Sequence, residues 1–210
     1  MYLCGVKNSL NREILRLAVP SILANITVPL VGMVDTAVAG HLPECGGADA
    51  ATFIGAISVG VMLFNLLYWN FGFLRTGTGG LTAQAYGRGS RRDCAAILYR
   101  GLALALGVSV VLLALQWPFV KLVLACTQAS AEAEALAAEY FFIRIWAAPA
   151  TVSLMAFRGW FVGMQDSVSW MWKDLIGNLT NAGVSVVLTF GVGGGKGIGF
   201  IGIAWGTVIA

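Results

Sequence analysis

The stretch LAVPSILANITVPLVGMVDTAVAG, residues 17–40, decides the class of fold because it is long, apolar and carries one charge, Asp35. A helix needs about 20 such residues to cross the hydrocarbon core of a bilayer. Further stretches with few charges follow, and inside a bilayer each must satisfy its backbone groups internally, as a helix does. The sequence therefore predicts an all-α integral membrane protein, a bundle of six transmembrane helices at approximately 15–40, 50–74, 95–120, 136–157, 173–192 and 198–210, the last of them truncated.

The composition agrees with this class. Of 210 residues, 58% are hydrophobic and 11% are charged, roughly half the usual charged share of a soluble domain, and the mean hydropathy is +0.81. The formal net charge of +3 comes from basic residues spread over three loops, which is the pattern of a membrane protein. It implies no nucleic-acid partner.

The basic residues also predict the orientation, because loops on the cytoplasmic side are rich in Lys and Arg. One side of the predicted bundle carries Lys7, Arg12, Arg16, Arg75, Arg88, Arg91, Arg92, Arg100, Arg158 and Lys173. The other side keeps Lys121 and Lys196, with Arg144 as a further candidate. We expect a cytoplasmic N-terminus in a bacterial-type cytoplasmic membrane. A cleaved signal peptide is the alternative for the first stretch, although its apolar run is longer than such peptides use.

Glycines spaced four apart, as in Gly159/Gly163 and Gly202/Gly206, predict close helix packing, since small residues let backbones approach in lipid. Residues 75–93 read as a Gly- and Arg-rich connection in which 81–86 could form an interfacial helix.

The four cysteines form no CxxC pair and read as apolar fillers, with a Cys45–Cys126 disulfide left open.

Asp35 is the leading candidate for function because a carboxylate within a membrane span is costly unless it is protonated, paired or facing a wet cavity. The alternative is a helix-end carboxylate that reaches the outer surface. Pro20 lies fifteen residues earlier on the same helix. It could bend that helix or simply begin the span, and position alone does not separate these interpretations.

The span at 173–192 carries a polar stripe of Asp174, Asn178, Asn181 and Ser185, which are spaced to share one face. Such a stripe could line a cavity for ions or water, or it could supply hydrogen bonds between helices. Ser185 lies at a depth similar to that of Asp35 if the two helices are neighbours. We therefore predict a polar pocket of Asp35, Asn181 and Ser185.

Enzymatic and metal chemistry are not indicated. His41 is the only histidine, so a histidine metal site is excluded, and no nucleophile–base arrangement is visible. The segment 197–202 matches GxGxxG by chance, because no strand precedes it. We expect no enzyme activity and no cofactor.

Five segments together resemble the MATE (multidrug and toxic compound extrusion) family, specifically its DinF-like branch. They occur in family order: VDTAVAGH at 34–41, FGFLRTGTGGLTAQAYG at 71–87, GWFVGMQD at 159–166, NLTN at 178–181 and GIAWGT at 202–207.

The resemblance implies a twelve-helix exporter of two six-helix lobes, of which residues 1–210 match the N-terminal lobe. It implies efflux of small organic, cationic or amphipathic compounds in exchange for H⁺ or Na⁺, and so the need for a second lobe. Asp35 matches the family's cation-binding aspartate, Pro20 its bending proline and Asn181 a polar residue lining the lobe cavity. Asn178 belongs to the same segment.

The chain departs from the family pattern at Ser185, where an aspartate is usual, and at Trp170, where a proline is common. A lone Asp35 favours H⁺ over Na⁺ as the coupling ion, although Na⁺ at Asp35 stays open. Two other functions remain: a lipid-linked oligosaccharide flippase of the same superfamily, and a non-transporting half-length membrane protein.

Overall fold

The computed structural model describes residues 2–42, 49–127, 129–191 and 197–210, and for residues 2–10 and 13 it describes the backbone alone. These residues form helices and connecting turns, with no strand among them. In chain order they are α1 (Tyr2–Gly40), α2 (Ala50–Trp69), α3 (Gly72–Gly87), α4 (Arg91–Ala125), α5 (Ala131–Arg144), the 3₁₀ turn η1 (Ile145–Ala147), α6 (Ala148–Gly163), α7 (Ser167–Phe190) and α8 (Ile201–Ile209).

The all-helical class is confirmed, but the expected number of six helices is not. Two predicted spans are broken: 50–74 becomes α2 and α3, and 136–157 becomes α5 and α6 joined by η1. Each break coincides with a change of partner, because α2 packs on α5 whereas α3 packs on α6. Within the described residues, four helical segments are long and apolar enough to cross a membrane: Ile14–Gly40, Ala50–Trp69, Arg91–Ala125 and Ala131–Gly163.

The Gly-rich segment expected as a connection is mostly helix. α3 runs to Gly87, and Arg88–Ser90 make the only turn before α4. Gly89 has φ +72°, a conformation that favours glycine, and the Ser90 side chain accepts a hydrogen bond from the backbone N–H of Asp93. The helix survives its glycines because it packs along α6 and α4, and this tertiary contact outweighs weak helix propensity.

Helix α1 continues through two prolines, Pro20 and Pro29, without interruption. Each proline removes the backbone N–H that would bond the carbonyl four residues earlier. Pro20 is buried and Pro29 is exposed, so the first proline faces the protein and the second faces away from it.

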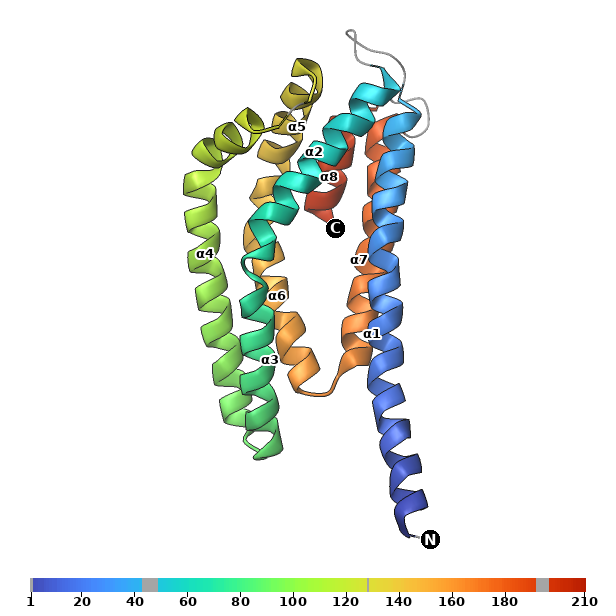
Figure 1. The fold of residues 1–210 in the computed structure, drawn as a ribbon, viewed down its shortest axis with the longest axis vertical. Helices are drawn as coiled ribbons and strands as arrows, with labels where there is room; N and C mark the ends of the chain where they lie inside the picture. The colour runs from blue at the N-terminus through green and yellow to red at the C-terminus, as the bar shows by residue number, and fades with distance from the viewer. Residues whose placement is uncertain (1, 43–48, 128, 192–196) are drawn as a thin grey trace.

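The helices form two groups that meet at one end of the bundle (Figure 1). α1 and α7 run side by side on one flank, whereas α3, α4 and α6 form the other. α2, α5 and α8 gather at the end opposite the α3–α4 and α6–α7 turns, around an aromatic core. There Phe64 stacks on Phe141 with ring centroids 4.8 Å apart, and Phe53 stacks on Phe200 at 5.6 Å. We call the opposite end, with the two turns, the basic end, because Arg88, Arg91 and Arg92 lie there.

The prediction of glycine packing is confirmed within the chain. A Cβ built on Gly163 would lie 2.7 Å from the Gly79 carbonyl oxygen and 2.7 Å from Thr82 Cβ, and one on Gly159 would meet the Arg75 carbonyl. α3 and α6 therefore touch backbone to backbone. Gly202 and Gly206 bring α8 equally close to Thr189 and Ser185 of α7.

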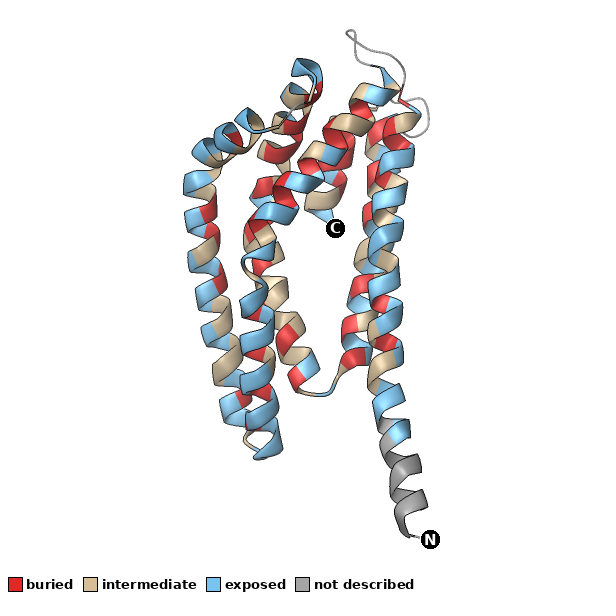
Figure 2. Ribbon diagram, in the orientation of Figure 1, coloured by how far each residue is buried: buried red, intermediate tan, exposed pale blue. Residues whose placement is uncertain are grey.

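Exposed residues follow the outer faces of the helices (Figure 2), and many of them are large and apolar. On α1 the exposed residues Ile22, Ile26, Leu30 and Met33 follow helical spacing. Such a stripe suits contact with lipid or with another membrane-embedded element. Cys45 lies outside the described residues, so the structure does not test a Cys45–Cys126 disulfide.

Candidate functional site

Asp35 lies on α1 at the end of the bundle that holds the aromatic core, and it is buried, with a relative exposure of 7%. Its Oδ1 atom has no hydrogen-bond partner among the described residues. This burial contradicts the alternative of a carboxylate that reaches an outer surface. A buried, incompletely bonded carboxylate is costly, so Asp35 is a group suited to bind a proton or a cation.

Helices α1 and α7 are neighbours, as the predicted pocket requires. They run in the same direction (Figure 1) and are joined by a hydrogen bond of 2.6 Å from Asn178 Nδ2 to Thr27 Oγ1. Asp35 comes eight residues after Thr27, and Ser185 comes seven after Asn178. The two side chains therefore start from similar heights on adjacent parallel helices.

The polar stripe of α7 divides into parts with different surroundings. Asn178 bonds to α1, and Asp174 lies toward the basic end, 3.4 Å from Lys173. Asn181 is buried, and its Oδ1 has no partner among the described residues. Ser185 is fully buried against Gly206 of α8, and its hydroxyl is likewise unpartnered there. Asp35, Asn181 and Ser185 thus each keep an unsatisfied oxygen on the neighbouring helices α1 and α7, and the structure records no hydrogen bond among them.

The sequence did not predict where the side chain of Arg144 lies. This residue ends α5 and turns inward, where its Nη1 donates a 2.6 Å hydrogen bond to Tyr140 Oη and its guanidinium lies 4.8 Å from the Phe64 ring centroid. Its charge acts on Asp35. The sequence signal was present, since Tyr140 and Arg144 are four apart and share a helix face. A cationic side chain therefore lies among the aromatic rings of Phe64 and Tyr140.

A second polar cluster joins the two helix groups toward the basic end. Arg158 of α6 donates a 2.6 Å hydrogen bond to Asn25 Oδ1 of α1, and its guanidinium lies 5.6 Å from the Trp170 ring centroid. Asp174 and Arg75 also act on Arg158 through their charges. Pro20 sits one residue before Ser21, which lines the pocket beside this cluster.

A family model described as MatE matches residues 20–187, which include α1 from Pro20 and nearly all of α7. The chain belongs to the MatE family. It is therefore a multi-pass membrane protein of a family of transporters, not of enzymes. The resemblance drawn from the five segments is confirmed.

Curated relatives agree with the MatE assignment. DNA damage-inducible protein F of Escherichia coli (strain K12) is 35% identical over 184 residues, covering 88% of this chain and 39% of that protein. The probable multidrug resistance protein NorM of Caulobacter vibrioides is 28% identical, covering 94% of this chain and 41% of that protein. The chain thus spans about two fifths of the length of these relatives.

Solved structures show the same fold at low identity. The crystal structure of MATE in the bent conformation gives a TM-score of 0.81 at 20% identity, over 95% of this chain and 42% of the other. A MOP superfamily transporter from Pyrococcus furiosus gives 0.80 at 20% identity, over 94% and 41%. These likenesses establish the helix arrangement alone.

Proposed function

We propose that these residues form the N-terminal lobe, residues 1–210, of a MATE exporter that expels small organic, cationic or amphipathic compounds. The observation that carries the proposal is Asp35, a buried carboxylate with an unpartnered oxygen in the first membrane helix of a MatE chain. Curated relatives named as multidrug resistance proteins support the substrate class.

The coupling ion acts through the charge of Asp35. When the carboxylate is ionised, it favours arrangements of the bundle that bring the positive charge of Arg144 closer to it. A bound proton cancels that attraction and so favours a different arrangement. Because an ion can shift an equilibrium only by binding two states unequally, this difference is the source of coupling. Na⁺ would bind the same carboxylate with oxygens such as those of Asn181 and Ser185, and we favour H⁺ because Asp35 is the one carboxylate among them.

If α2 with α3 forms one membrane span, and α5 with α6 forms another, the chain crosses the membrane six times. The other four crossings are then α1, α4, α7 and α8. The basic end then faces the cytoplasm, as the distribution of Lys and Arg favours, in a bacterial-type cytoplasmic membrane. A second six-helix lobe completes the pathway, and relatives more than twice as long support this.

The test is efflux of a fluorescent organic cation from cells that express the protein in its native extent. Asp35→Asn is compared with wild type at matched membrane levels, and the pH and sodium gradients are dissipated in turn. Asp93→Asn is the matched control, since Asp93 is exposed at the start of α4 and pairs with Arg88 at 3.8 Å. We expect efflux to vanish in Asp35→Asn, to persist in Asp93→Asn and to stop without the pH gradient.

Efflux that persists in Asp35→Asn contradicts the role of Asp35, and efflux driven by sodium alone contradicts proton coupling. Equal dye retention in wild type and in cells without the gene contradicts organic-cation export. That last result would favour the flippase or the non-transporting membrane protein instead.

A further inference from the structure

A pocket of about 410 Å³ lies between the two helix groups toward the basic end. Its lining comes from four helices and includes Asn25 of α1, Arg75 and Gly80 of α3, Arg158 of α6 and Trp170 of α7. It is distinct from the surroundings of Asp35, and the export mechanism proposed above makes no use of it.

The pocket is rich in hydrogen-bond donors. Asn25 uses its carbonyl oxygen to accept from Arg158, which leaves its NH₂ group to donate. Trp170 is buried, with 6% exposure, and its indole N–H, which can only donate, has no partner among the described residues. A buried donor without an acceptor is costly, so a ligand in this pocket that accepts a hydrogen bond from the Trp170 indole N–H would relieve that cost.

The charges at the pocket favour a negatively charged ligand that accepts hydrogen bonds. Arg75 and Arg158 both line the pocket and bring two like charges to it. Asp174 offsets part of this charge, but it is also paired with Lys173 at 3.4 Å. An anion between the two arginines would relieve their repulsion and accept from both, and the guanidinium fork suits phosphate in particular.

We infer that this pocket binds a phosphate group, supplied by an anionic phospholipid headgroup or by a free phosphate compound. Gly80 of α3 leaves room for it, because a Cβ there would meet nothing within 4 Å. The inference rests on the pocket alone and does not depend on efflux.

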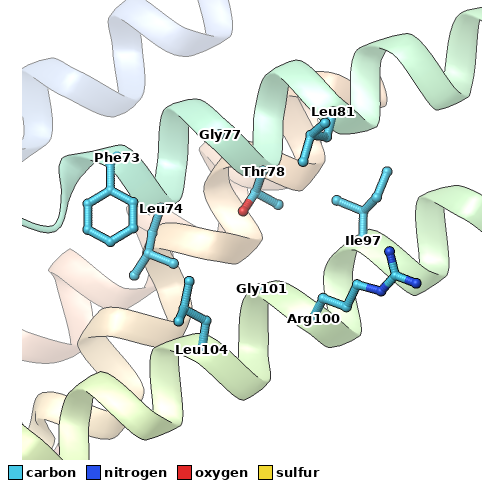
Figure 3. A pocket seen from close by; sticks show the side chains of 9 residues that line it. All are labelled: Phe73, Leu74, Gly77, Thr78, Leu81, Ile97, Arg100, Gly101 and Leu104. Carbon is cyan, nitrogen blue, oxygen red and sulfur yellow. The ribbon is translucent and has the colours of Figure 1, made fainter.

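A neighbouring pocket between α3 and α4 offers matched controls (Figure 3). It has a volume of about 230 Å³ and is lined by Phe73, Leu74, Gly77, Thr78, Leu81, Ile97, Arg100, Gly101 and Leu104. Leu74, Leu104 and Thr78 point into it, with the Arg100 side chain at one edge. Arg100 supplies the same charge as Arg75, and Gly77 has the same open space as Gly80.

The experiment titrates the protein in its native extent, purified in a neutral detergent, by calorimetry. The probes are dihexanoyl phosphatidylglycerol, inorganic phosphate and the zwitterionic dihexanoyl phosphatidylcholine. We expect at least one anionic probe to bind more tightly than the zwitterion. We expect Arg75→Gln and Gly80→Val each to weaken that binding at least tenfold, with Arg100→Gln and Gly77→Val within twofold of wild type.

The two anionic probes separate the sources of the phosphate. Binding of phosphatidylglycerol alone supports a lipid headgroup, and binding of inorganic phosphate as well supports a free anion. The inference is overturned if neither anion binds, or if the Arg100 and Gly77 controls lose as much affinity as the pocket variants. Arg75 is exposed, so its substitution tests the site even if Gly80→Val fails to fold.

Discussion

The two long helix pairs of the bundle, α3 with α6 and α1 with α7, pack by opposite means. The first pair meets backbone to backbone at glycines, where an added Cβ on Gly159 or Gly163 has no room. In the second pair a Cβ added on Gly32 or Gly183 meets nothing within 4 Å, and the helices share the side-chain hydrogen bond of Asn178 with Thr27. Close-packed backbones have one arrangement, whereas side chains can exchange partners. The comparison teaches that α3–α6 is suited to be the scaffold and α1–α7 to be the part that moves.

The largest effect is expected from Gly159→Val. The new side chain would lie against the Arg75 carbonyl and 3.0 Å from the Gly79 amide nitrogen, so the helices must separate. We expect a loss of about 3 kcal/mol or more in unfolding free energy, measured by thermal unfolding in detergent. Gly183→Val on α7, where a Cβ meets nothing within 4 Å, should be nearly neutral. Similar losses in both variants would contradict the comparison.

A smaller effect is expected where the two groups are tied together, at Arg158 and Asn25. A double-mutant cycle of Arg158→Met and Asn25→Ala should give a coupling energy of about 1 kcal/mol, since the hydrogen bond is charged but partly solvated. Arg100→Met paired with Asn25→Ala is the control and should give none. A coupling of zero for the Arg158 pair would mean that the groups are held by their turns and core alone.

Within the α1–α7 pair, Asn178→Leu removes the contact with Thr27. We expect a loss of about 0.6 kcal/mol, because polar contacts between membrane helices are weak on average. Thr180→Leu, at an exposed position of α7, is the control for the change in apolarity. A loss as large as that of Gly159→Val would show that this pair is no looser than the other.

The smallest effect is expected outside both pairs, at Asp49, which caps α2. The backbone N–H and hydroxyl of Thr52 donate to its carboxylate and hold its pKa below the ordinary value of 3.8. A lowered folded-state pKa stabilises the protein above the unfolded-state pKa, and this contribution is lost as pH falls through the folded-state value. Wild type should therefore unfold at a slightly higher temperature than Asp49→Asn at pH 7, and the gap should narrow as the pH falls below 3.8. A gap that widens on acidification would contradict the role of Thr52.

Much of the contrast between the α3–α6 pair and the α1–α7 pair could be predicted from sequence. The spacing of Gly159 and Gly163 predicts close packing because small residues act locally, through the absence of a side chain. The placement of Asp35 in a span also follows from one stretch of sequence. The family resemblance followed from segments in order along the chain, and it was confirmed.

The breaks between α2 and α3 and between α5 and α6 could not be predicted in this way. No proline or polar run marks Asn70 and Phe71, and the break reflects which helix packs on which. Arg144 was counted with loop charges because sequence position gives the place of its Cα, whereas a long side chain decides where the charge lies. In the sequence, only the spacing of four residues from Tyr140 indicates that the Arg144 side chain lies on the buried face of its helix.

The two prolines of α1 bear on hydration. Pro20 and Pro29 leave the carbonyls of Arg16 and Asn25 without their helical N–H partners, and inside a membrane a free carbonyl needs a substitute donor. Ser21, next to Pro20, lines a pocket that can hold water. Because Pro20 faces the protein and Pro29 faces away from it, ordered water is expected in α1 beside Pro20, so that its infrared carbonyl bands respond to exchange into D₂O while those of the tightly packed α3 and α6 do not.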